Sequence, residues 1–283
     1  MIGAPLVLTG AVAGVVALLD THGPVIERCE ATLASSEQFA LDPEQTDNAA
    51  LMTAISLERG LPARAATIAI ATAFQESKVR NIDYGDRDSL GLFQQRPSQG
   101  WGTPEQVTDP AYATNAFYDA LVQVADYRDL PVTEAAQAVQ RSAFPNAYAD
   151  HEPLARAFAS ALTGYSPAAL RCDLRNATGA ERERAQSTFL ARAQRDFVRI
   201  DATGREDGSV LLDATSLLPG AQGQEARRIA WAVAQWAVAT ADHTGVTRVA
   251  TDGMAWERSS GAGGWLPYDD EAEPLGPGLV VVS

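Results

Sequence analysis

Glu76 is the residue whose place in the sequence best fits a chemical role. It lies at the end of the Ala/Ile-rich segment 63–77, whose positions are apolar almost without a break, and a polar loop containing glycine follows it. Apolar surroundings and the negative end of a helix dipole both favour a protonated carboxylic acid. Cleavage of a glycosidic bond needs such an acid to protonate the leaving oxygen. A glutamate in the last helical turn is more often a surface or capping residue, so this position alone is a weak indication.

The loop that follows supplies further polar groups. A hydrolase often uses a second carboxylate across the cleft, and Asp86 and Asp88 are the candidates for it. Asp83 is a weaker candidate, and all three have a competing role, because aspartates near glycine usually form turns. The side-chain amides of Gln94 and Gln95 can hydrogen-bond sugar hydroxyl or N-acetyl groups, or can pack in the core. The aromatic side chains that can stack on sugar rings, or equally pack in the core, are Tyr84, Trp101, Tyr112 and Tyr148.

A mostly helical region must position these side chains. The first helix is expected to begin near Thr46, with Thr46 or Asp47 as its N-cap. The second is apolar nearly all round, which is typical of a buried central helix. Apart from a possible small hairpin over residues 82–93, no strand is indicated in this region. The expected helices run from Thr46 to a stop at Gly60 and Pro62, and then over residues 64–77, 108–128, 133–141 and 152–163.

The pattern changes after residue 172. Residues 173–196 are highly charged and helical, which indicates a linker helix. The part that follows, residues 197–283, has the spacing of strand, helix and strand, which predicts a small α/β or α+β domain. We therefore expect an α+β chain, with a mostly α domain at residues 45–172 before the small one. The expected elements of the small domain are strands at 197–200, 209–213 and 246–251 and a helix at 224–242.

The segment at residues 1–20 is predicted to be a transmembrane anchor or a signal peptide. It carries no charge from Ile2 to Leu19, which is long enough for either role. No clear cleavage site follows, so an uncleaved anchor is the first interpretation, a cleaved signal the second and a buried core helix the third. Residues 21–44 then form an acidic connection. We expect a single-pass protein of the cell membrane with extracytoplasmic domains, or a secreted protein.

Composition and cysteine usage narrow the function classes. A formal net charge of −14 argues against nucleic acid as a partner, since that requires basic patches. Cys29 and Cys172 stand just outside the two ends of the helical region, and one disulfide between them would contribute on the order of 2–4 kcal/mol. The alternative is two unrelated buried thiols. No metal site and no cofactor are expected, because His22, His151 and His243 have no ligand spacing with a cysteine.

Several short motifs follow Glu76 in a fixed order. Ser77 comes directly after it, then Ser89-Leu90-Gly91-Leu92-Phe93-Gln94, and then Asp109-Pro110 followed by Asn115 and Tyr118. This set resembles the lysozyme-like superfamily that includes soluble lytic transglycosylases and goose-type lysozymes, with Phe93 in place of the usual Met. A closer resemblance is to actinobacterial extracellular wall hydrolases that share GDRDSLGLFQQRPSQGWGTPEQ and AAQAVQRSAFPNAY. The resemblance covers residues 45–165.

The resemblance implies that Glu76 is the general acid, and then the general base, in cleavage of peptidoglycan glycan strands. Lytic transglycosylases use this one carboxylate, and the 6-hydroxyl of the sugar attacks to give a 1,6-anhydro product; a muramidase places water instead. One departure is that Val139-Gln140 stands where the family commonly has Tyr-Asn. The alternative function is therefore a catalytically inactive scaffold that binds the cell wall. The expected substrate contacts are Ser77, Tyr84, Gln94, Gln95, Gln140 and Tyr148.

The C-terminal part resembles the small domain of some actinobacterial wall hydrolases, which is related to zinc D-Ala-D-Ala peptidases. Such peptidases need His and Asp ligands around the position of Asp213. Residues 204–208 carry no histidine where one is expected, and His243 is the only histidine nearby. The resemblance therefore implies a degenerate domain that is not catalytic and that serves wall binding or packing. The expected partners are peptidoglycan strands and, through the N-terminal segment, a membrane.

Overall fold

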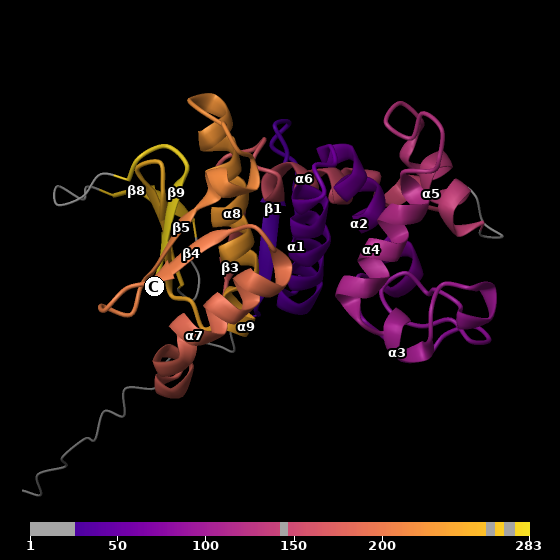
Figure 1. Cartoon of the computed structure of the whole chain (residues 1–283), viewed down its shortest axis with the longest axis horizontal. Coiled ribbons are helices and arrows are strands. Elements are labelled where there is room, and N and C mark those ends of the chain that lie inside the picture. Colours follow the sequence, from indigo (N-terminus) through magenta and orange to yellow (C-terminus); the bar gives the residue numbers. More distant parts are fainter. Residues whose placement is uncertain (1–25, 142–146, 259–263, 269–274) are drawn as a thin grey trace, which may run out of the picture.

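The computed structural model describes residues 26–141, 147–258, 264–268 and 275–283. It has the predicted α+β class, with a helical N-terminal region beside a six-stranded antiparallel sheet and its helices (Figure 1). None of the helices in these described ranges is long and apolar enough to cross a membrane. The segment predicted to be an anchor or signal, residues 1–20, lies outside them.

The N-terminal region is built around one buried helix, α2, as its sequence predicts. Side chains from Ala65 to Ala73 are almost entirely buried, and α2 packs against α1, α4, α5 and α6. Its many alanines permit close approach of these neighbours, so the region has little free space around the segment that ends in Glu76. The helices are α1 (Pro43–Glu58), α2 (Ala63–Ser77), α3 (Pro104–Val107), α4 (Pro110–Leu121), α5 (Val132–Gln140) and α6 (Glu152–Leu162).

The start of α1 differs from the prediction. Its N-cap is Asp42, whose carboxylate accepts the backbone N–H of Gln45 at 3.0 Å. The side-chain oxygen of Gln45 accepts the backbone N–H of Asp42 at the same distance, which completes a capping box with Pro43 in the first position. The proposed caps Thr46 and Asp47 are therefore wrong, because they already lie within the helix.

A three-stranded sheet that the sequence did not indicate flanks the helices. Its order is β2-β1-β3, all antiparallel, and two of the strands lie in the segment expected to be a connection. Cys29 on β1 faces Cys172 on β3, and the predicted disulfide joins them. The hairpin expected over residues 82–93 is wrong, because only a single bridge, Leu90 with Gln95, occurs there. The strands are β1 (Arg28–Thr32), β2 (Gln38–Leu41) and β3 (Leu170–Asp173).

The C-terminal sheet has six strands in the order β4-β5-β9-β6-β7-β8, and every pair is antiparallel. The strand expected at residues 197–200 is wrong: those residues turn, and Phe197 is buried against Trp236. The helix expected at 224–242 is present as α8 (Gln224–Ala239), followed by the short α9 (Ala241–Thr244). The strands are β4 (Asp201–Gly204), β5 (Val210–Asp213), β6 (Arg248–Thr251), β7 (Met254–Glu257), β8 (Trp265–Pro267) and β9 (Leu279–Val282).

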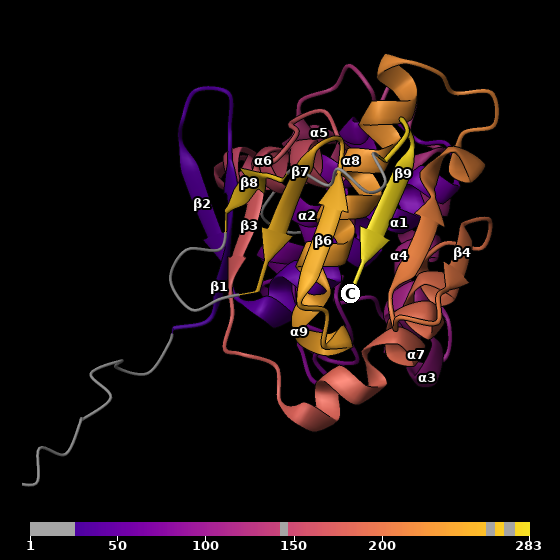
Figure 2. The same cartoon turned by 90° about the vertical axis from the view of Figure 1, so that its left-hand side faces the viewer.

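Helix α8 connects the two parts of the molecule. The Gln235 side chain donates to the carbonyl of Ala161 at 2.7 Å and accepts the N–H of Leu170 at 2.8 Å. The Trp265 indole donates to the carbonyl of Leu170, so β8 lies near β3 and the two sheets stand side by side (Figure 2). The buried apolar residues of both parts form one continuous core.

The charged segment expected as a linker helix is α7 (Gly179–Asp196), and it packs against α1, α9 and β4. Its Arg192 is buried between the carboxylates of Asp47 and Asp196. The indole of Trp236 also donates to Asp196. Buried charges require such pairing, so α7 is fixed to α1 and α8 rather than free.

Candidate active site

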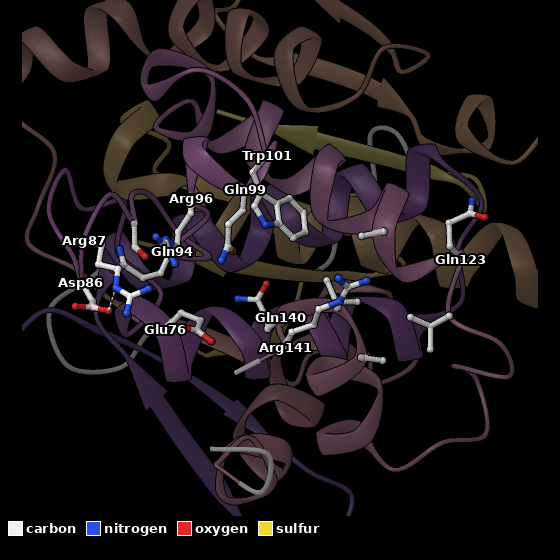
Figure 3. Close-up of a pocket in the computed structure, with 15 residues that line it drawn as sticks. Glu76, Asp86, Arg87, Gln94, Arg96, Gln99, Trp101, Gln123, Gln140 and Arg141 are labelled. Atoms are coloured by element: carbon white, nitrogen blue, oxygen red, sulfur yellow. Dashed lines mark ion pairs between the residues drawn. The ribbon is translucent and has the colours of Figure 1, made fainter. Parts of the chain in front are cut away.

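A cleft of about 1090 Å³ opens beside the C-terminal end of α2. Its other walls come from the loop between α2 and α3, from α4 and from α5. Glu76 lies on one wall with Gln140 near it, and Trp101 and Gln99 face them from the loop (Figure 3). The residue singled out from the sequence therefore borders the cleft in the helical region.

The Glu76 carboxyl is held by one neutral donor. The hydroxyl of Tyr148 donates to Glu76 Oε1 at 2.7 Å, and the Tyr148 side chain is completely buried. The turn that carries Tyr148 is also joined to α2 by His151, whose Nε2 lies 2.8 Å from Gln75 Oε1. Burial, and then the charge of Lys78, lower the pKa of His151, so its ring is neutral near pH 7. These contacts orient the carboxyl without placing a counter-charge on it.

Ser77 organises the wall of the cleft. Its hydroxyl donates to the carbonyl of Leu92 at 2.7 Å and lies 3.1 Å from the carbonyl of Ala73. It thereby attaches the loop that carries the motif at residues 89–94, here called the motif loop, to the end of α2. Gly91 in that loop has a φ of 75°, and a Cβ there would stand 2.1 Å from the carbonyl oxygen of Val107. Only glycine fits that position, which explains its place in the motif.

The two glutamines of the motif have different surroundings. Gln94 lines the cleft, and its amide donates to the carbonyl of Tyr84 at 3.2 Å. Gln95 is 1% exposed and donates to the carbonyl of Ala113 at 3.0 Å. Gln94 is therefore available to a ligand, whereas Gln95 connects the loop to α4 and is not one of the residues that line the cleft.

The departure at Val139-Gln140 has a structural counterpart. Gln140 lines the cleft, and its amide donates to the carbonyl of Phe93 at 2.8 Å, which joins α5 to the motif loop. Val139 forms part of the cleft wall. The tyrosine that lies beside Glu76 in this structure is Tyr148, which comes from the turn before α6 and not from α5. Because its ring is buried, Tyr148 cannot stack on a sugar, and the sequence reading missed its contact with Glu76.

The two aspartates proposed as a second carboxylate lie in different settings. Asp86 borders the cleft, but its side chain is 93% exposed, with Arg87 at 3.9 Å. Asp88 accepts the backbone N–H of Ser98 at 2.7 Å, the Ser98 hydroxyl and the Nε of Arg96 at 2.9 Å. These donors, Ser98 first, hold the pKa of Asp88 well below its usual range. Asp88 therefore stabilises the loop and does not line the cleft, and Asp83 does not line it either.

Of the aromatic residues suggested for sugar stacking, Trp101 borders the cleft. Tyr84 is 69% exposed and Tyr112 is 37% exposed, and both lie outside the lining residues. The Tyr112 ring packs close to Gly102. Three guanidinium groups that were not predicted as site residues also line the cleft: Arg87 and Arg96 lie in the first quoted motif, and Arg141 lies in the second.

The C-terminal part shows no metal centre in the residues the structure describes, where no group of three or more His, Cys, Asp or Glu side chains could hold an ion. Asp213 accepts the N–H of Thr215 at 2.9 Å and its hydroxyl at 2.6 Å, which caps the turn after β5. Its role there is that of a turn residue.

No protein-family model matches the chain, and no curated protein matches it either.

Proposed function

We propose that this protein cleaves the glycan strands of peptidoglycan and that Glu76 is its catalytic acid and base. The observation that carries the proposal is the Glu76 carboxyl, which borders the cleft of about 1090 Å³ and accepts a hydrogen bond from the buried Tyr148 hydroxyl. Gln94 and Gln140 present amide groups to the same cleft, and Trp101 presents an aromatic ring, which are the groups that bind sugars.

The proposed reaction has two proton transfers at Glu76. The carboxylic acid gives its proton to the glycosidic oxygen as the bond from that oxygen to the sugar C1 breaks. The carboxylate then takes the proton of the 6-hydroxyl of the same sugar, whose oxygen bonds to C1. The product is a 1,6-anhydro sugar, and Glu76 is protonated again. Tyr148 holds one carboxyl oxygen in place through both steps, so the other oxygen faces the substrate.

The setting of the second carboxylates favours this intramolecular attack over hydrolysis. A nucleophilic or water-activating carboxylate must be held at a defined distance from the acid. Asp88 is occupied by Ser98 and Arg96, and the largely exposed Asp86 has the adjacent Arg87 as its charged partner among the described residues. Attack by the substrate's own hydroxyl needs neither residue.

Digestion of purified peptidoglycan, followed by mass spectrometry of the products, tests the proposal. We expect anhydro-muropeptides from the wild type and about a hundredfold to ten-thousandfold slower release from Glu76→Gln, because general acid–base catalysis supplies about 10² to 10⁴ in rate. Glu183→Gln, an exposed change on α7, makes the same charge change and should match the wild type.

The other outcomes separate the alternatives. Products with reducing ends that also require Glu76 would identify a muramidase. If wild type and Glu76→Gln are equally inert but both sediment with the cell wall, the protein is an inactive wall-binding scaffold and the proposed enzyme activity is wrong.

A further inference from the structure

The cleft concentrates positive side chains in a chain of net charge −14. Arg87, Arg96 and Arg141 line it, against the carboxylates of Glu76 and Asp86. The rest of the molecule has a large acidic excess, which would repel an anionic polymer. Guanidinium groups in the cleft would therefore attract the anionic parts of a ligand, against the repulsion of this acidic background.

Two of the three guanidinium groups already have acidic partners. Arg96 Nε donates to Asp88 at 2.9 Å, and Arg87 has Asp86 at 3.9 Å. Arg141 differs: its backbone N–H caps α5 by donating to Gln137, but its exposed guanidinium has no ion pair within the described part of the chain. In Figure 3 this group lies beyond Gln140 from Glu76.

Small apolar side chains line the same cleft as Arg141. Ala138 and Val139 come from α5, Ala120 comes from α4, and Val124 lies in the segment after α4. A free cation beside small apolar side chains suits a carboxylate attached to a small aliphatic group better than a bare inorganic anion. Val139 leaves space in the cleft beside Arg141, because the tyrosine that the resemblance implies at this position would extend further from α5.

We propose that Arg141 forms a subsite for a carboxylate carried by the glycan strand. The inference rests on the proposed function and specifies which part of the substrate the cleft recognises. Two sources have the required chemistry: the lactyl group of a muramic sugar that has lost its peptide, and the stem peptide of an intact one. Both place a carboxylate next to a methyl group.

Binding to the full chain carrying Glu76→Gln, measured by calorimetry, tests the subsite without turnover. Three ligands separate the sources: a neutral N-acetylglucosamine oligomer, glycan stripped of peptide by an amidase, and glycan with intact stem peptides. We expect one of the two carboxylate-bearing ligands to bind about tenfold or more tightly than the neutral oligomer, as expected for a charge-assisted hydrogen-bonded pair. The ligand that shows this excess identifies the source.

Arg141→Gln, added to the Glu76→Gln chain, should remove the excess affinity for the carboxylate-bearing ligand. Binding of the neutral oligomer should stay unchanged, which also shows that the variant is folded. Arg184→Gln, an exposed arginine on α7, should retain the excess. If both arginine variants bind all three ligands like the parent, the proposed subsite is wrong, whereas the proposal that the cleft binds glycan is still supported. If no ligand binds any of the variants, both the subsite and the proposed function are wrong.

Discussion

Glu76 and Tyr148 are separated by 72 positions, and their hydrogen bond is the contact on which the site depends. A tyrosine hydroxyl is a neutral donor, so it orients the carboxyl without the counter-charge that a lysine or arginine would place beside it. The same residues show why an acid at a helix end was a weak indication by itself. What the structure adds is a fixed carboxyl at the border of a large cleft.

Tyr148→Phe removes that donor, while the ring can stay in its buried position. A hydrogen bond to an ionised group contributes about 1.5–3 kcal/mol, so we expect kcat to fall about tenfold to a hundredfold with a small change in KM. Steady-state release of soluble glycan fragments measures this effect. Tyr165→Phe, on an exposed ring, is the matched control. An unchanged kcat would show that Tyr148 does not position the acid.

At the scale of the elements, the motif loop depends on the end of α2. Ser77 donates to Leu92 in the loop, and Gln140 reaches the neighbouring Phe93 from α5. The wall of the cleft is thus attached from both sides, through side chains that belong to the motifs. Ser77 and Gln140 were predicted to contact substrate, which stays a prediction; their hydrogen bonds show that both hold the loop in place, and Gln140 also lines the cleft.

Ser77→Ala is therefore expected to weaken the fold as well as activity. It leaves the carbonyl of Leu92 buried without its donor, which costs about 1–3 kcal/mol in the free energy of unfolding. The midpoint of urea denaturation measures the change. Ser187→Ala is the control, because that exposed hydroxyl bonds only within its own helix, α7, and should shift the midpoint little. Equal shifts in the two variants would contradict a role for Ser77 in holding the loop.

The helices were easier to predict from the sequence than the strands. The period of apolar residues identified α1, α2, α4, α5 and α6, since each helix repeats its pattern over several turns. Strands β1 and β2 have only four or five residues each, too few to display alternation, and their partner β3 is far away in the chain. Glu76 was found because its motif is local in the sequence. Its contact with Tyr148 was missed because it joins residues 72 positions apart.

At the scale of the whole molecule, the composition suggests two domains, yet one apolar core extends through both. The junction is built from groups that cannot be left unpaired. Gln235 on α8 is completely buried and bonds the carbonyls of Ala161 and Ser166 as well as the N–H of Leu170. The helical region that carries the cleft is therefore packed against the C-terminal part through α8.

Gln235→Leu should destabilise both parts together. It keeps the approximate size of the side chain but removes the hydrogen-bond partner of the Ser166 carbonyl and of the Leu170 N–H, at about 1–3 kcal/mol each. The free energy of unfolding should fall. Unfolding followed by tryptophan fluorescence and by loss of glycan binding should still show one coincident transition. Gln222→Leu, in an exposed loop, should leave the free energy of unfolding unchanged. If the two signals separate, with fluorescence changing while binding persists, the C-terminal part unfolds alone and the continuous core does not couple it to the cleft.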